Sequence, residues 1–148
     1  MATKKVKEKK QNQKLVEILR SWKTTETYTI KGCEKITAET GNPIVKTIIN
    51  AIRSDSEKHK SILQLILDSM TKKAITLTPD EIAELSSSIN RHISLEEKTI
   101  EYAENAIGRS TDPVVKQLLK YILEDEMKHK KMLEQINALK IRALAKIT

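Results

Sequence analysis

The sequence has few residues that interrupt helices and no cysteine pair that could stabilise a small secreted domain. Its 148 residues include three glycines, three prolines, one cysteine and no phenylalanine. A single cysteine excludes an intramolecular disulfide, and without a Cys-x-x-Cys pair we expect no zinc ribbon and no rubredoxin-type iron centre. The composition is rich in leucine, isoleucine, lysine, glutamate and alanine, which predicts one all-helical domain large enough to bury a core.

Long hydrophobic runs are also missing. No apolar run approaches the roughly 18–20 residues that a membrane-spanning helix needs, and no signal-peptide core is present. We therefore expect a cytoplasmic protein that does not contact a membrane.

Positive charge gathers at the N-terminus. Residues 1–14 hold six lysines and one glutamate, which contribute +5 of the formal net charge of +7. We interpret residues 1–13 as a basic flexible tail that precedes a domain at residues 14–148, because such charge runs are usually solvated. A contact between this tail and nucleic acid is the alternative, but we do not expect it because the tail lacks arginine and interleaved aromatic residues.

The sequence matches itself when it is shifted by 70 residues. Residues 19–66 align without a gap with residues 89–136, and 14 positions are identical. The identical positions include Glu26 with Glu96 and His59 with His129, so that in each copy the glutamate precedes the histidine by 33 residues. This pattern indicates a duplicated two-helix unit.

Hydrophobic periodicity predicts helices at about residues 14–38, 43–70, 79–107 and 113–145. The predicted helix starts are Asn42-Pro43, the capping box that begins at Thr78, and Asp112-Pro113. Gly108 is the predicted C-cap of the third helix. Two hairpins with short loops and one longer connection predict a ferritin-like antiparallel four-helix bundle, built from two repeated helical hairpins with a crossover between helices 2 and 3.

The crossover has a length problem. Helices 2 and 3 run parallel in such a bundle, so the link must travel most of a helix of about 39 Å. The eight residues 71–78 reach about 26–29 Å when fully extended. Either part of residues 79–88 belongs to the crossover, or hairpins are exchanged between two chains. We therefore expect a homodimer, with hairpin exchange as one form of it.

Polar residues interrupt the apolar stripes of these helices. Glu126 and His129 are three residues apart and lie on one helical face that is otherwise apolar. A buried carboxylate and imidazole need a partner, and a metal ion is one such partner. The alternative is that these residues lie on an exposed face, but the duplicated spacing argues against it. The candidate metal ligands are Glu26, His59, Glu96, Glu126 and His129.

This pattern resembles the ferritin-like superfamily, and within it the rubrerythrin-type di-iron carboxylate proteins, over about residues 14–140. The motif of that family is one glutamate from each of two helices and a Glu-x-x-His pair from each of the other two. Glu26 and Glu96 match the single glutamates, and Glu126 with His129 is an intact pair. His59 lacks its partner, because Ser56 stands where the family has a bridging glutamate.

The resemblance also implies supporting residues. Asp55 and Asp125 match an aspartate that hydrogen-bonds the opposing histidine in relatives, and so orients its ring. Ser56 is expected beside the metal rather than bound to it. His92 lies one turn before Glu96, and we assign it to the core or the rim because its repeat counterpart is Trp22.

The function that the resemblance implies is oxidation of ferrous iron or detoxification of peroxide or oxygen. The expected cofactor is iron, as a di-iron centre, or manganese, without haem. A peroxidase of this kind would need an external electron donor, since the chain has no rubredoxin-type centre. Because position 56 lacks the glutamate, two alternatives stay open: a metal-depleted bundle that acts as an interaction module without enzymatic activity, and a basic-tailed protein that protects nucleic acid.

Overall fold

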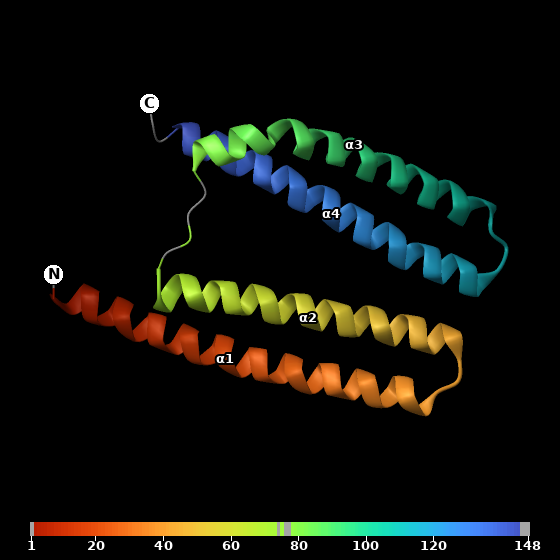
Figure 1. The fold of residues 1–148 in the computed structure, drawn as a ribbon, viewed down its shortest axis with the longest axis horizontal. Coiled ribbons are helices and arrows are strands. Elements are labelled where there is room, and N and C mark those ends of the chain that lie inside the picture. The colour runs from red at the N-terminus through yellow and green to blue at the C-terminus, as the bar shows by residue number, and fades with distance from the viewer. Residues whose placement is uncertain (1, 74, 76–77, 146–148) are drawn as a thin grey trace. The chain divides into compact units, whose positions relative to one another are not determined.

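The computed structural model describes residues 2–73, 75 and 78–145, and the side chains of residues 3–73, 75 and 78–139. These residues form four helices and no strand: α1 (Ala2–Glu39), α2 (Pro43–Thr71), α3 (Pro79–Arg109) and α4 (Pro113–Ala145) (Figure 1). The predicted all-α class is thus confirmed for the described part of the chain, in which no helix is long and apolar enough to span a membrane.

The chain divides into two compact units, Met1–Ile75 and Thr76–Thr148. In the first, α1 packs against α2, and in the second, α3 packs against α4. We call the pair α1 and α2 hairpin 1, and the pair α3 and α4 hairpin 2.

The helix starts predicted from capping residues are confirmed. Asn42 Oδ1 accepts hydrogen bonds from the backbone N–H groups of residues 44 and 45, at 2.9 and 3.2 Å, at the start of α2. Thr78 and Glu81 form the predicted capping box of α3, in which the Thr78 N–H donates to Glu81 Oε2 at 2.8 Å. Asp112 caps α4 in the same way as Asn42 caps α2, at 2.8 and 3.3 Å.

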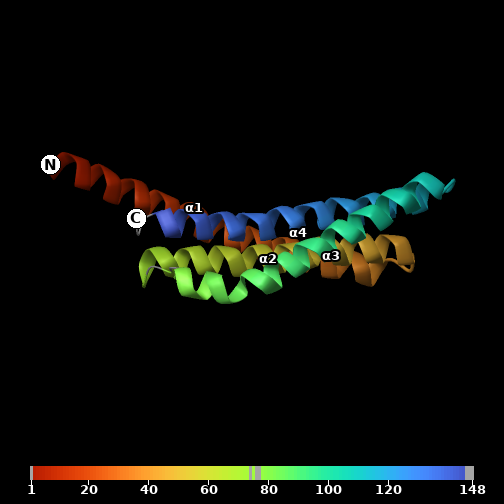
Figure 2. The ribbon, with the colours of Figure 1, turned by 90° about the horizontal axis from the view of Figure 1, so that it is seen from above.

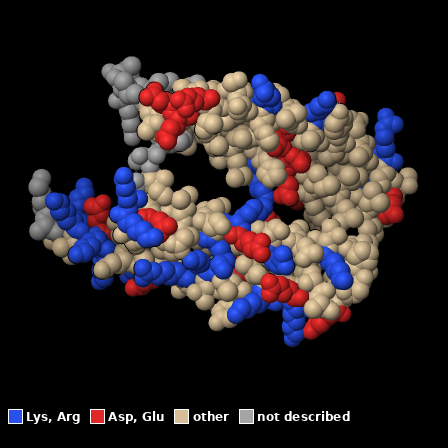
Figure 3. All heavy atoms as spheres, viewed as in Figure 1, with Lys and Arg blue, Asp and Glu red and all other residues tan. Residues whose placement is uncertain are grey.

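Two predicted helix ends are wrong. The first helix begins at Ala2 rather than near Lys14, and its N-terminal part extends beyond the end of α2 (Figures 1 and 2). Lysine side chains gather over this part (Figure 3), and residues 3–15 are all exposed. Gly108 is not a C-cap, because α3 continues through Arg109 and the Ser110 N–H bonds to the carbonyl oxygen of Ala106 at 3.0 Å.

In each hairpin, the buried residues of one helix follow one another at intervals of seven residues. On α1 the buried residues are Leu19, Glu26 and Cys33. On α3 they are Ile82, Ile89, Glu96 and Ala103. The two glutamates therefore occupy positions within the buried apolar stripes, as the sequence predicts.

Hairpin 1 also has an apolar face outside its own contact line. At 100° per residue, this face lies about a quarter turn from the buried stripe on both helices of hairpin 1, on the side that carries His59. Its exposed members are Leu15, Ile18, Trp22, Ile36, Val45, Ile52, Ile62 and Ile66. Two helices in contact bury only one stripe each, so a face of this kind is typical of a surface that another layer covers.

Candidate metal centre

The candidate ligands divide between the two hairpins. Glu26 and His59 belong to α1 and α2, whereas Glu96 belongs to α3 and the pair Glu126 and His129 to α4. Each hairpin brings its own members together. A meeting of all five side chains would join the two hairpins, and it stays a prediction.

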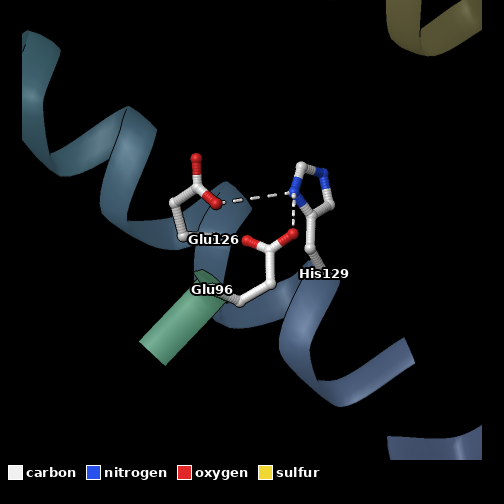
Figure 4. Close-up of side chains that lie close together, drawn as sticks. All are labelled: Glu96, Glu126 and His129. Atoms are coloured by element: carbon white, nitrogen blue, oxygen red, sulfur yellow. Dashed lines mark ion pairs between the residues drawn. The ribbon is translucent and has the colours of Figure 1, made fainter. Parts of the chain in front are cut away.

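In hairpin 2 the three side chains converge on one point (Figure 4). His129 Nδ1 lies 3.9 Å from Glu96 Oε1 and 3.8 Å from Glu126 Oε2. One ligand atom from each of the three residues lies within 4.8 Å of the others. With metal–ligand bonds of about 2.0–2.2 Å, two atoms on one ion are at most about 4.4 Å apart, so small side-chain shifts would bring all three onto one ion.

The Glu96 carboxyl group is buried and only partly hydrogen-bonded at this point. Its side chain is 8% exposed, and its buried Oε2 atom has no hydrogen-bond partner among the described residues. Contact with the Glu126 carboxyl raises the pKa of Glu96, and burial and the Glu126 charge raise it further, against the weaker opposite effects of His129 and His92. Repulsion between two ionised carboxylates is relieved by a proton on one of them or by a cation that contacts both.

Two neighbours hold these carboxylates from the side. His92 Nε2 lies 3.1 Å from Glu96 Oε1, one helical turn before it, although the His92 ring is mostly exposed. The Thr99 hydroxyl donates to Glu126 Oε2 at 3.2 Å. The sequence assigned His92 only to the core or rim; its spacing of four residues from Glu96 was the signal for this contact.

In hairpin 1 the Glu26 carboxylate already has hydrogen-bond partners within the protein. The Trp22 indole N–H donates to Glu26 Oε1 at 2.9 Å, and His59 Nδ1 lies 3.1 Å from the same oxygen. A hydrogen bond from the Ser56 hydroxyl is the main cause that lowers the pKa of Glu26; burial opposes it, and Trp22 and His59 add to the lowering. The pairing of Glu26 with His59 follows from their 33-residue spacing, but the Trp22 contact was not predicted.

The two aspartates have neighbours on their own helices. Asp55 forms an ion pair with Lys58, and Asp125 Oδ1 lies 2.7 Å from Lys128 Nζ. All four of these side chains are substantially exposed. The expected hydrogen bonds that these aspartates would accept from the opposing histidines stay a prediction.

No family model matches the chain, and no curated protein or solved structure matches it either.

Proposed function

We propose that this chain is a metal-binding protein whose ion, iron or manganese, is held by carboxylate and imidazole groups at Glu96, Glu126 and His129. The observation that carries the proposal is the convergence of these three side chains beside a buried carboxylate, Glu96, whose Oε2 atom has no hydrogen-bond partner among the described residues. Carboxylate and imidazole together suit iron and manganese, and their combination with open positions is typical of redox sites.

The activity that we propose follows from the resemblance to rubrerythrin-type proteins. It is oxidation of ferrous iron or detoxification of peroxide or oxygen, with an external electron donor for the peroxidase reaction. A bound iron would supply the electron-transfer chemistry. The role of the chain's own residues is to bind and orient: Glu96 and Glu126 neutralise the cation, and His129 contributes a neutral ligand.

For the fold, we propose that the hairpins assemble into a ferritin-like four-helix bundle. The support is the apolar face of hairpin 1 together with the internal repeat, because two duplicated hairpins with such faces can cover each other. The ligands also lie near the middle of their helices, where a two-fold axis perpendicular to the helices would superpose them.

The link between the hairpins bears on how such a bundle forms. Since α3 is helical from Pro79 onwards, the link is limited to residues 72–78. It spans at most about 25 Å when extended, whereas the 29 residues of α2 extend about 44 Å. A crossover bundle therefore requires hairpins from two chains, and we propose a homodimer with exchanged hairpins.

Light scattering coupled to gel filtration tests this assembly. We expect a mass of about 34 kDa, twice the 16.9 kDa of one chain, at micromolar concentration. A Trp22→Glu variant should weaken the dimer, because a charge on the covered face is costly to bury. A mass of one chain for the unmodified protein would contradict the dimer, while the metal site of hairpin 2 would be unaffected.

A second candidate function is a metal-free interaction module. The observation that favours it is the state of hairpin 1, where Ser56 is buried in place of a carboxylate and Glu26 is hydrogen-bonded without an ion. Hairpin 2 does not share this feature, which is why we prefer the metal-binding function.

Metal analysis separates the two functions. The protein is purified without chelator, loaded with ferrous ion under nitrogen or with Mn²⁺, and desalted before elemental analysis. We expect about one ion per chain or more, because two carboxylates and an imidazole at this spacing bind first-row metals. The double variant Glu96→Gln, His129→Ala is the control for adventitious ions. Fewer than about 0.2 ions per chain after loading would rule out the metal-binding function.

A further inference from the structure

The candidate-centre residues of hairpin 1 differ from those of hairpin 2 at two corresponding positions of the internal repeat. Glu126 of hairpin 2 corresponds to Ser56 of hairpin 1, and His92 corresponds to Trp22. Each of these two differences alters a contact of the glutamate that both copies share, Glu96 in one copy and Glu26 in the other.

We propose that the halves are unequal: hairpin 2 alone holds the ion, one divalent cation per chain, whereas Glu26 and His59 form a closed hydrogen-bonded pair that does not ligate it. This inference rests on the proposed function and assigns the ion to one hairpin. It departs from the five-ligand centre that the family resemblance predicts.

Charge and ligand count support hairpin 2 as the binding half. Glu96 and Glu126 together carry two negative charges when ionised, which a divalent cation balances, and His129 adds a neutral nitrogen. The three ligand atoms already lie within 4.8 Å of one another. The buried Glu96 Oε2 has no donor, so the ion would replace no existing hydrogen bond at that atom.

Hairpin 1 lacks a second carboxylate and has fewer ligand atoms to offer. It offers one carboxylate and one imidazole, and its third position is the Ser56 hydroxyl, a poor ligand for a transition metal when neutral. Glu26 Oε1 receives the Trp22 N–H at 2.9 Å and lies 3.1 Å from His59 Nδ1. Ligation through these two atoms would break this contact, as ligation by Glu96 Oε1 would break its contact with His92, so the missing second carboxylate is what sets hairpin 1 apart.

The same contacts suggest what hairpin 1 does instead. The Trp22 and Ser56 hydrogen bonds fix the Glu26 carboxylate, and Glu26 in turn orients the His59 ring through Nδ1. The side chain of His59 remains about half exposed. Hairpin 1 therefore holds His59 as an oriented, half-exposed ring rather than as a metal ligand.

The test is a titration of the metal-free full chain with Mn²⁺. Binding is measured by calorimetry or by the loss of the electron paramagnetic resonance signal of free Mn²⁺. Four proteins are compared: the unmodified chain, Glu96→Gln, Glu26→Gln, and Glu97→Gln. Glu97 is the matched control, because it adjoins Glu96 but faces Lys130 at 3.3 Å on the surface. Helical content is checked by circular dichroism, and His129→Ala replaces Glu96→Gln if that variant does not fold.

We expect one tight ion per chain for the unmodified protein and for Glu97→Gln. Glu96→Gln should weaken the affinity by about 100-fold, because it removes a charged ligand, whereas Glu26→Gln should change it by less than about threefold. Two tight ions per chain, or an equal loss in Glu26→Gln and Glu96→Gln, would overturn the inference and leave the metal-binding function standing. No binding by the unmodified chain would overturn both.

Discussion

Replacing Ser56 with glutamate is expected to raise the metal content of the chain from about one ion toward two. The substitution gives hairpin 1 the carboxylate that hairpin 2 has in Glu126, opposite Glu26 and three residues before His59. Ser56 is buried at the contact of α1 and α2, so a longer acidic side chain there would face Glu26 rather than solvent. The Ser56→Gln variant is the matched control, because it has the same size without the charge.

The same substitution should make the metal-free protein less stable. In the unmodified chain the Ser56 hydrogen bond lowers the pKa of Glu26. A carboxylate in its place would repel Glu26 and leave a buried acid unpaired, at a cost of about 1–3 kcal/mol near neutral pH relative to Ser56→Gln. An ion at 100 times its dissociation constant would restore about 2.7 kcal/mol.

Elemental analysis and urea unfolding, each with and without Mn²⁺, measure both effects. If the metal content of Ser56→Glu equals that of Ser56→Gln, then hairpin 1 cannot adopt the geometry of hairpin 2, and the assumed equivalence of the two copies is wrong.

The stability of the metal-free protein should depend on pH in opposite ways through the two buried glutamates. The pKa of Glu26 is lowered from 4.5, so its contribution to stability is present above that value and is lost as the pH falls through the folded-state pKa. The pKa of Glu96 is raised from 4.5, so its contribution is complete below that value and is lost as the pH rises through the folded-state pKa.

Glutamine variants separate these contributions. Relative to the unmodified chain, Glu26→Gln should be more destabilising at about pH 7 than at about pH 4. Glu96→Gln should become more favourable over the same rise in pH, since it removes a buried charge that the Glu126 carboxyl and burial disfavour. The measurement is the free energy of unfolding in urea across this range, with chelator present and with Glu97→Gln as the control. The same direction of change in both variants would show that the two sites are electrostatically alike, contrary to the contacts described.

Most of the helical architecture could be predicted because its signals are local. Asn42, Thr78 and Asp112 precede proline, and each caps the helix that follows it. The start of α1 could not be predicted in the same way, because residues 2–13 are exposed and lack the apolar period that marks a packed helix. Gly108 was misread because a glycine near a helix end favours a left-handed cap, whereas no described glycine has a positive φ.

The candidate centre was predictable to the extent that it depends on spacing. The three-residue spacing of Glu126 and His129 places them on one face, and the repeat indicates that Glu96 packs opposite them. The contacts of Trp22 and His92 are additional, since a four-residue spacing shows that side chains can meet but not that they do. The packing of one hairpin on the other depends on long-range contacts, and it stays a prediction.

The most direct test of the metal site is an anomalous difference map from crystals of the full chain grown with Mn²⁺. We predict a peak within about 2.0–2.3 Å of carboxylate oxygens of Glu96 and Glu126 and of a ring nitrogen of His129. Bound manganese elsewhere, with these three side chains free of metal at full occupancy of the other sites, would contradict the central claim.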